Sequence, residues 1–161
     1  MLLKWLDRTT LPVEAEGLTP SALASLTADE ARRRSVRLGN ERAEIGDLFA
    51  VEQAGSDPEA LIIEGDLRSV AGIGRGMDGG SLTVRGVAGP HAGAGMSGGV
   101  LDIDGDAGDW AGAGMRGGIL KIRGSAGRCL GGAYPGERLG MRGGVILVEG
   151  SVGDDAGRRM R

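Results

Sequence analysis

The sequence predicts an all-β fold: a right-handed parallel β-helix with one strand per 19-residue repeat, preceded by a small α+β cap. Three observations predict this class. Glycine supplies 33 of the 161 residues, about three times the ordinary share. All but four of these glycines lie after residue 60, where Gly-Gly pairs and methionines recur at a nearly constant interval. Each pair is followed by a short segment of alternating apolar residues. We therefore expect a cap over 1–58 and about five stacked turns over 59–161, open at the C-terminal end.

The first region carries signals for short helices and turns. Thr27-Ala28-Asp29-Glu30 is a capping-box sequence, which predicts a short helix over about 28–34. Gly39-Asn40 predicts a turn, and Asp57-Pro58 marks the end of the region. Between them lies a compact apolar patch of Ile45, Leu48, Phe49 and Val51.

The repeat is defined by methionines that precede each Gly-Gly pair or its expected place. Successive methionines are 19, 19, 26 and 19 residues apart, and we interpret the long interval as one repeat plus the seven-residue insertion Tyr134–Gly140. One strand per repeat leaves no room for a crossover helix, which excludes a doubly wound sheet and favours a solenoid. Stacked once per turn, the methionines are expected to fill the core. They are Met77, Met96, Met115, Met141 and Met160; the glycine pairs are at 79/80, 98/99, 117/118 and 143/144.

The segments after the glycine pairs are predicted to be strands, because apolar residues alternate in them with period two. The expected strands are 81–85, 100–104, 119–123 and 145–149, with a shorter first copy at 61–64. Their inward side chains are expected to be Leu82, Val84, Leu101, Ile103, Leu120, Ile122, Ile146 and Val148.

The residue that closes each expected strand is charged, and its sign alternates from repeat to repeat. If the strands stack in register, every charge has opposite neighbours, and such pairs contribute about 0.2–1 kcal/mol each. This alternation favours direct stacking over a set of independently solvated side chains. The five residues are Glu64, Arg85, Asp104, Arg123 and Glu149.

Several motifs are interpreted as structural. The pattern G-x-G-x-x-G occurs at 74–79, 93–98 and 112–117, but a dinucleotide site needs one copy followed by a helix, and here a strand follows each copy. His91, the single histidine, could serve as the base of an acyltransferase, although a surface loop histidine is favoured. Cys129 has no identifiable general base and is interpreted as a small buried thiol. We predict no catalytic, cofactor-binding or metal-binding residue.

The residues after the methionines suggest a surface feature. These positions hold Asp78, Ser97, Arg116, Arg142 and Arg161, so stacking would place arginine beside arginine in consecutive repeats. Like charges that stack directly destabilise a sheet. Either the side chains spread into water, which we favour, or an anion or acidic partner binds a ridge made of Arg116, Arg142 and Arg161.

Composition narrows the setting and the partners. The net charge is −3, and no basic stretch is interleaved with aromatic residues, so nucleic acid is not an expected partner. One cysteine cannot form an internal disulfide, and no apolar run is long enough for a membrane span. We expect a cytoplasmic protein.

The repeat Gly-x-x-x-Gly-x-Gly-Met-x-Gly-Gly-x-Leu-x-Val-x-Gly over 61–161 resembles the GXGXG domain shared by the glutamate synthase large chain and by the C subunit of formylmethanofuran dehydrogenase. Two features are similar to the second family: Gly39-Asn40 followed by 45–49, and the inserted segment 131–144. The Ala- and Arg-rich composition is more similar to the C subunit of the bacterial formyltransferase/hydrolase complex.

The resemblance implies a scaffold subunit without an active site, working in tetrahydromethanopterin-linked one-carbon metabolism. It implies a formyltransferase subunit and a molybdoenzyme-related subunit as partners. The implied cofactors lie outside this chain: a methanofuran-type formyl carrier, and molybdenum or tungsten in another subunit. The carrier's glutamate-containing tail would be an anionic partner for the arginine ridge. Family members continue for several more turns, so we expect the chain to be truncated or its open end to be covered.

Two alternatives stay open at the level of sequence. One is the structural GXGXG domain of a glutamate synthase, which predicts a much longer chain. The other is a free-standing β-helix acyltransferase, which should carry a cluster of His, Asp or Arg in one groove, whereas the sequence offers only His91 and scattered charges.

Overall fold

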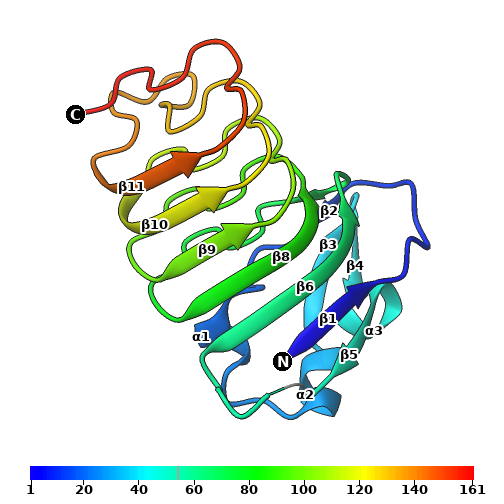
Figure 1. Ribbon diagram of the computed structural model, residues 1–161. Helices are drawn as coiled ribbons and strands as arrows, with labels where there is room; N and C mark the ends of the chain where they lie inside the picture. Colours follow the sequence, from blue (N-terminus) through cyan, green and yellow to red (C-terminus); the bar gives the residue numbers. More distant parts are fainter. Residues whose placement is uncertain (54) are drawn as a thin grey trace.

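The computed structural model describes residues 1–53 and 55–161, and the regular secondary structure within them is mostly β-strand with a few short helices (Figure 1). The predicted all-β class is confirmed at this level. The elements in chain order are β1 (Leu2–Trp5), β2 (Val13–Glu14), α1 (Pro20–Leu23), α2 (Ala28–Arg32), β3 (Ser35–Leu38), β4 (Glu41–Glu44), α3 (Ile45–Leu48), β5 (Phe49–Glu52), β6 (Ala60–Leu67), β7 (Val70–Ala71), β8 (Ser81–Ala88), β9 (Val100–Ile103), β10 (Arg116–Ile122) and β11 (Gly143–Val148).

The repeats contribute their strands to one sheet, in sequence order. The order in this sheet is β11-β10-β9-β8-β6-β1-β5, and β6, β8, β9, β10 and β11 each pair in parallel with the next (Figure 1). Residues 19 apart are direct neighbours in it, as where Leu82 pairs with Leu101 and Leu101 with Leu120. Isolated parallel bridges join Ala88, Ala107, Ala126 and Val152 along a second line. The 19-residue period is therefore a period of stacking.

The side chains predicted to point inward form the core. Leu82, Val84, Leu101, Ile103, Leu120 and Ile122 are all buried, whereas Ile146 and Val148 on β11 are half-buried. The methionine column follows the same gradient: Met77, Met96, Met115 and Met141 are buried, but Met160 is 48% exposed. The prediction of a core position is wrong for Met160, because β11 forms the edge of the sheet in the described part of the chain.

The charges at the strand ends stack as the alternation predicted. Arg85 forms an ion pair with Glu64 at 2.7 Å, and Arg123 lies 3.3 Å from Asp104. Arg123 also reaches back to Asp102 at 3.1 Å, and these carboxylates together raise the pKa of Arg123. Among the described residues, ion pairs therefore form at two steps of the series, Glu64–Arg85 and Asp104–Arg123, but not between Arg85 and Asp104 or between Arg123 and Glu149.

The two glycines of each pair are required for different reasons. The second glycine has a left-handed backbone, with φ of 76° at Gly99 and 81° at Gly118. The first touches the preceding repeat: a Cβ on Gly98 would lie 2.3 Å from the carbonyl oxygen of Asp78. At Gly79, the equivalent position one repeat earlier, a Cβ would meet nothing within 4 Å. Close stacking of the backbone thus accounts for the first glycine of three pairs, Gly98, Gly117 and Gly143, but not for Gly79.

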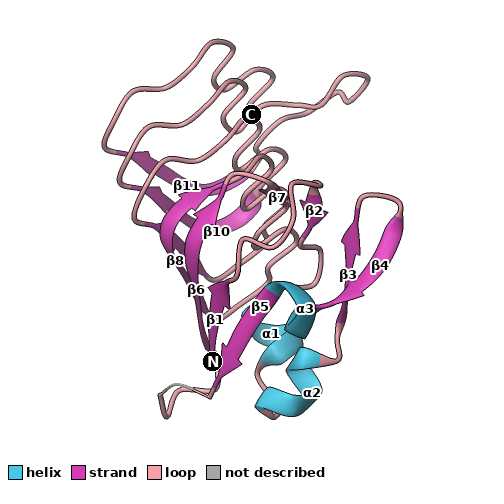
Figure 2. Ribbon diagram, turned by 90° about the vertical axis from the view of Figure 1, so that its right-hand side faces the viewer, coloured by secondary structure: helices cyan, strands magenta, loops and turns pink. Residues whose placement is uncertain are grey.

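The N-terminal region joins the same sheet. β1 pairs in parallel with β6 and antiparallel with β5, while β2 pairs with β7 and with the hairpin strand β3 in a second, four-stranded sheet. The predicted capping box forms at Thr27 and Glu30, although the helix α2 that it starts ends at Arg32. The helices α2 and α3 pack beside β5 at the end of the large sheet, whereas α1 contacts β6 (Figure 2). The apolar patch of Ile45, Leu48, Phe49 and Val51 is buried there.

Candidate functional site

One corner of the repeats brings an unusual set of side chains into a column. His91, Trp110 and Cys129 lie 19 residues apart, and all three have left-handed backbones with φ near 60°. The backbone N–H of His91 donates to the Asp109 carbonyl, and the N–H of Trp110 donates to the Arg128 carbonyl, both at 2.8 Å. Left-handed backbone is uncommon outside glycine, so these positions are stabilised by their stacking.

The insertion returns to this column through Tyr134. The Tyr134 hydroxyl shares a hydrogen bond of 2.8 Å with Nδ1 of His91, and the Tyr134 ring stacks on Trp110 with centroids 5.0 Å apart. Burial, together with the charge of Arg75, holds the pKa of His91 below its ordinary value, and burial raises the pKa of Tyr134. The lowered pKa favours the neutral form of His91, and its ring anchors the insertion instead of standing free in a surface loop.

The anchored insertion closes one side of a groove of about 440 Å³. The floor consists of small residues from two stacked repeats, including Gly95 and Gly114. A Cβ on either glycine would meet nothing within 4 Å, so the space above the floor is open. The full lining is Arg75, Ala94, Gly95, Ala113, Gly114, Arg116, Tyr134, Glu137, Arg138, Leu139, Gly140 and Arg142.

The groove concentrates positive charge on a chain that is acidic overall. Four arginines line it against one carboxylate, that of Glu137, while the net charge of the chain is −3. Arg75 forms an ion pair with Glu16 at 2.8 Å. The other three, Arg116, Arg138 and Arg142, are exposed and have no ion pair or side-chain hydrogen bond to any described residue. Their guanidinium groups are available to an anion.

The predicted arginine ridge is stacked in the structure. The N–H of Arg142 donates to the carbonyl of Met115 at 2.8 Å, and the N–H of Arg161 donates to the carbonyl of Met141 at 3.1 Å. Arg116 and Arg142 line the groove, whereas Arg161 lies one repeat further along and outside the lining. Sequence reasoning missed Arg75, Arg138 and Tyr134, and the only signal for the aromatic column was the 19-residue spacing of His91 and Trp110.

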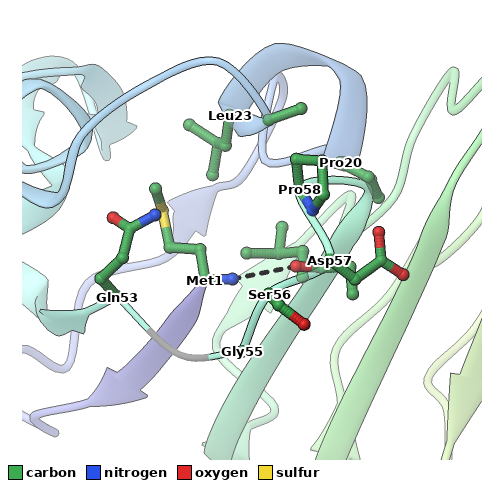
Figure 3. A pocket seen from close by; sticks show the side chains of 11 residues that line it. Met1, Pro20, Leu23, Gln53, Gly55, Ser56, Asp57 and Pro58 are labelled. Atoms are coloured by element: carbon green, nitrogen blue, oxygen red, sulfur yellow. Dashed lines mark hydrogen bonds between the residues drawn. The ribbon is translucent and has the colours of Figure 1, made fainter.

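A second, smaller cavity of about 110 Å³ lies where the N-terminus meets the segment before β6 (Figure 3). There the Met1 ammonium donates to the carbonyl of Ala60 at 2.9 Å. Asp57 carries the one titratable side chain among the residues that line this cavity. Gln53 and Ser56 are the other polar side chains of its walls, and its described lining has no second carboxyl, histidine or cysteine to work with Asp57.

The described residues contain no group of three or more His, Cys, Asp or Glu side chains placed to hold a metal ion. Over the same part of the chain, no helix is long and apolar enough to cross a membrane. Cys129 is buried and forms no disulfide with any described residue.

No family model matches the chain, but curated proteins similar to it are C subunits of formylmethanofuran dehydrogenases. It is 39% identical over 90 residues to the C subunit of tungsten-containing formylmethanofuran dehydrogenase 2 of Methanothermobacter thermautotrophicus, which covers 54% of this chain and 33% of the relative. It is 35% identical over 83 residues to the C subunit of molybdenum-containing formylmethanofuran dehydrogenase 1 of Methanothermobacter marburgensis, covering 52% of this chain and 21% of the relative.

A solved structure matches the whole chain. A chain of the formyltransferase/hydrolase complex FhcABCD from Methylorubrum extorquens, crystallised with methylofuran, aligns with a TM-score of 0.87 and 34% identity over 100% of this chain and 60% of that one. The chain thus spans a third or less of the two curated relatives and about three fifths of the solved chain. Sequence and structure agree that this chain belongs to the family of formylmethanofuran dehydrogenase C subunits.

Proposed function

We propose that this chain is the C subunit of a formylmethanofuran dehydrogenase-like or formyltransferase/hydrolase complex, and that it serves there as a non-catalytic scaffold in tetrahydromethanopterin-linked one-carbon metabolism. The observation that carries this proposal is the match along the full chain to a component of such a complex, at 34% identity and a TM-score of 0.87.

The architecture supports a scaffolding role. We interpret the stacked parallel strands as a right-handed parallel β-helix over 59–161, with residues 1–58 as a cap on its first turn. In such a stack, each repeat contacts mainly its neighbours, and its faces form long, rigid surfaces. The inward strand side chains of β8 to β10 form the core, and Arg85 and Arg123 form ion pairs within the stack.

The partners proposed for this scaffold are a formyltransferase subunit and a subunit related to the molybdenum or tungsten enzyme. The furan carrier and the metal are assigned to those subunits and not to this chain. The solved relative was crystallised with methylofuran, and the curated relatives are named for tungsten or molybdenum, which makes these the groups to look for in the complex.

Purification of the tagged chain from the organism that encodes it tests the assembly. Quantitative mass spectrometry should find the two partner subunits in constant ratio to the chain across the size-exclusion peak. A chain that elutes without them contradicts the assembly. Formyl transfer, formyl hydrolysis or carbon dioxide reduction by the purified chain alone would contradict the non-catalytic role.

A further inference from the structure

We propose that the arginine-lined groove binds an extended acidic segment of a protein partner, whose carboxylates pair with Arg116, Arg138 and Arg142. The groove has the same chemistry for any partner that presents such a segment. The assembly proposed above can therefore fail without affecting this binding site.

The charge distribution selects a carboxylate ligand. Three arginines elsewhere on the repeats are already paired with acids: Arg85 with Glu64, Arg123 with Asp102, and Arg128 with Asp109. In the groove only Arg75 is paired in this way among the described residues, and three exposed guanidinium groups face a lining with a single carboxylate. A planar guanidinium matches a carboxylate through two parallel hydrogen bonds, which gives both attraction and orientation.

The shape of the groove selects an extended chain. Arg116 and Arg142 belong to adjacent stacked repeats, so their backbones are about 4.8 Å apart along the stack. In an extended peptide, side chains on one face recur about every 6.6 Å, a step that long arginine side chains can follow. The floor at Gly95 and Gly114 carries no Cβ, which lets a peptide backbone approach closely.

The wall opposite the floor is held in place before any ligand arrives. Tyr134 is fixed by His91 and Trp110, and Arg159 donates a hydrogen bond to the backbone carbonyl of Glu137. The groove is therefore largely preformed, which lowers the entropy cost of binding. A nucleic acid fits less well, because the chain is acidic overall and Glu137 interrupts the positive lining of the groove.

A fluorescence polarisation titration of the purified protein tests the proposal with a labelled Glu-Gly-Glu-Gly-Glu peptide, capped at both ends. We expect saturable binding that weakens as salt is raised and no comparable binding of the Gln-Gly-Gln-Gly-Gln peptide. Arg116→Ala/Arg142→Ala should weaken binding by about tenfold, and Arg138→Ala by a few-fold, because these pairs are solvent-exposed.

The control is Arg8→Ala/Arg33→Ala, which removes the same charge from exposed positions outside the groove lining. Its affinity should stay within about twofold of the parent, and thermal unfolding should show that all variants fold. Equal binding of the two peptides, or an equal loss in the control and groove variants, would overturn the proposal. Displacement of the peptide by citrate at the same concentration would also overturn it, because it would indicate a small-anion site.

Discussion

Replacing Gly98 by alanine should destabilise the protein far more than the same change at Gly79. The two glycines occupy equivalent positions in adjacent repeats, and neither has a left-handed backbone. A Cβ at Gly98 would lie 2.3 Å from the carbonyl oxygen of Asp78 and 3.0 Å from its carbonyl carbon, both backbone atoms of the preceding repeat. At Gly79 a Cβ would meet nothing within 4 Å.

The size of the destabilisation follows from the backbone shift that the added methyl group requires. To accommodate the methyl group, the strand connection at Gly98 must shift by about 1 Å from the repeat below, and overpacking of this kind costs about 1–3 kcal/mol. The shift also strains the hydrogen bonds that the N–H groups of Ser97 and Gly98 donate to the Met77 carbonyl, at 2.9 and 3.3 Å. Loss of one of them costs about 1 kcal/mol more. We expect a total of about 3 kcal/mol for Gly98→Ala, and a change within about 0.5 kcal/mol for Gly79→Ala.

Thermal unfolding followed by circular dichroism measures the difference, with urea denaturation as a second method. For a domain of this size, about 3 kcal/mol lowers the melting temperature by about 6–12 °C. The Gly79→Ala protein controls for the change in unfolded-chain entropy, which is the same at both sites. Melting temperatures within about 2 °C of each other for the two variants would refute the claim that backbone contact with the preceding repeat requires glycine at position 98.

Three further predictions concern the cluster beneath the groove and the core. Because burial keeps the pKa of His91 low, the unfolded chain binds more protons than the folded chain, and the free energy of unfolding falls as the pH drops through about 6.5. His91→Asn should reduce this loss, which urea titrations at about pH 8 and about pH 5.5 measure. Tyr134→Ala should speed tryptic cleavage after Arg138, detected by mass spectrometry, whereas Tyr134→Phe, which keeps the ring, should not. Leu101→Ala should cost about 2–5 kcal/mol in urea unfolding, against less than about 1 kcal/mol for Leu147→Ala, a side chain 50% exposed; equal costs would contradict the assignment of the inner face.

The repeated part of the chain was predictable because stacking and sequence share one period. Once residues 19 apart are neighbours, alternation alone decides which side chains point inward, and Leu82, Leu101 and Leu120 are buried as expected. The start of β10 differs from the expected residue 119. β10 begins at Arg116, before its expected start, because Arg116 also pairs with Gly143.

The candidate site was predictable only in part. Arg116 and Arg142 could be placed together, since both follow a methionine of the repeat. Tyr134 and Arg138 belong to the insertion, where no equivalent residue in another repeat indicates a position. His91 meets Tyr134 across 43 residues of sequence, a contact that depends on how the insertion folds back. Arg75 has no arginine at the equivalent positions of the next repeats, which hold Ala94 and Ala113.

The alternating charges at the strand ends impose a parity rule on the length of the stack. Removing one whole repeat, such as 86–104, would bring Arg85 next to Arg123 and place like charges side by side. Removing two consecutive repeats, 67–104, would instead leave Glu64 beside Arg123 and restore an opposite pair. In terms of these charges, repeats can be lost or gained inside the stack without placing like charges together only in pairs, so the series constrains the number of whole internal repeats.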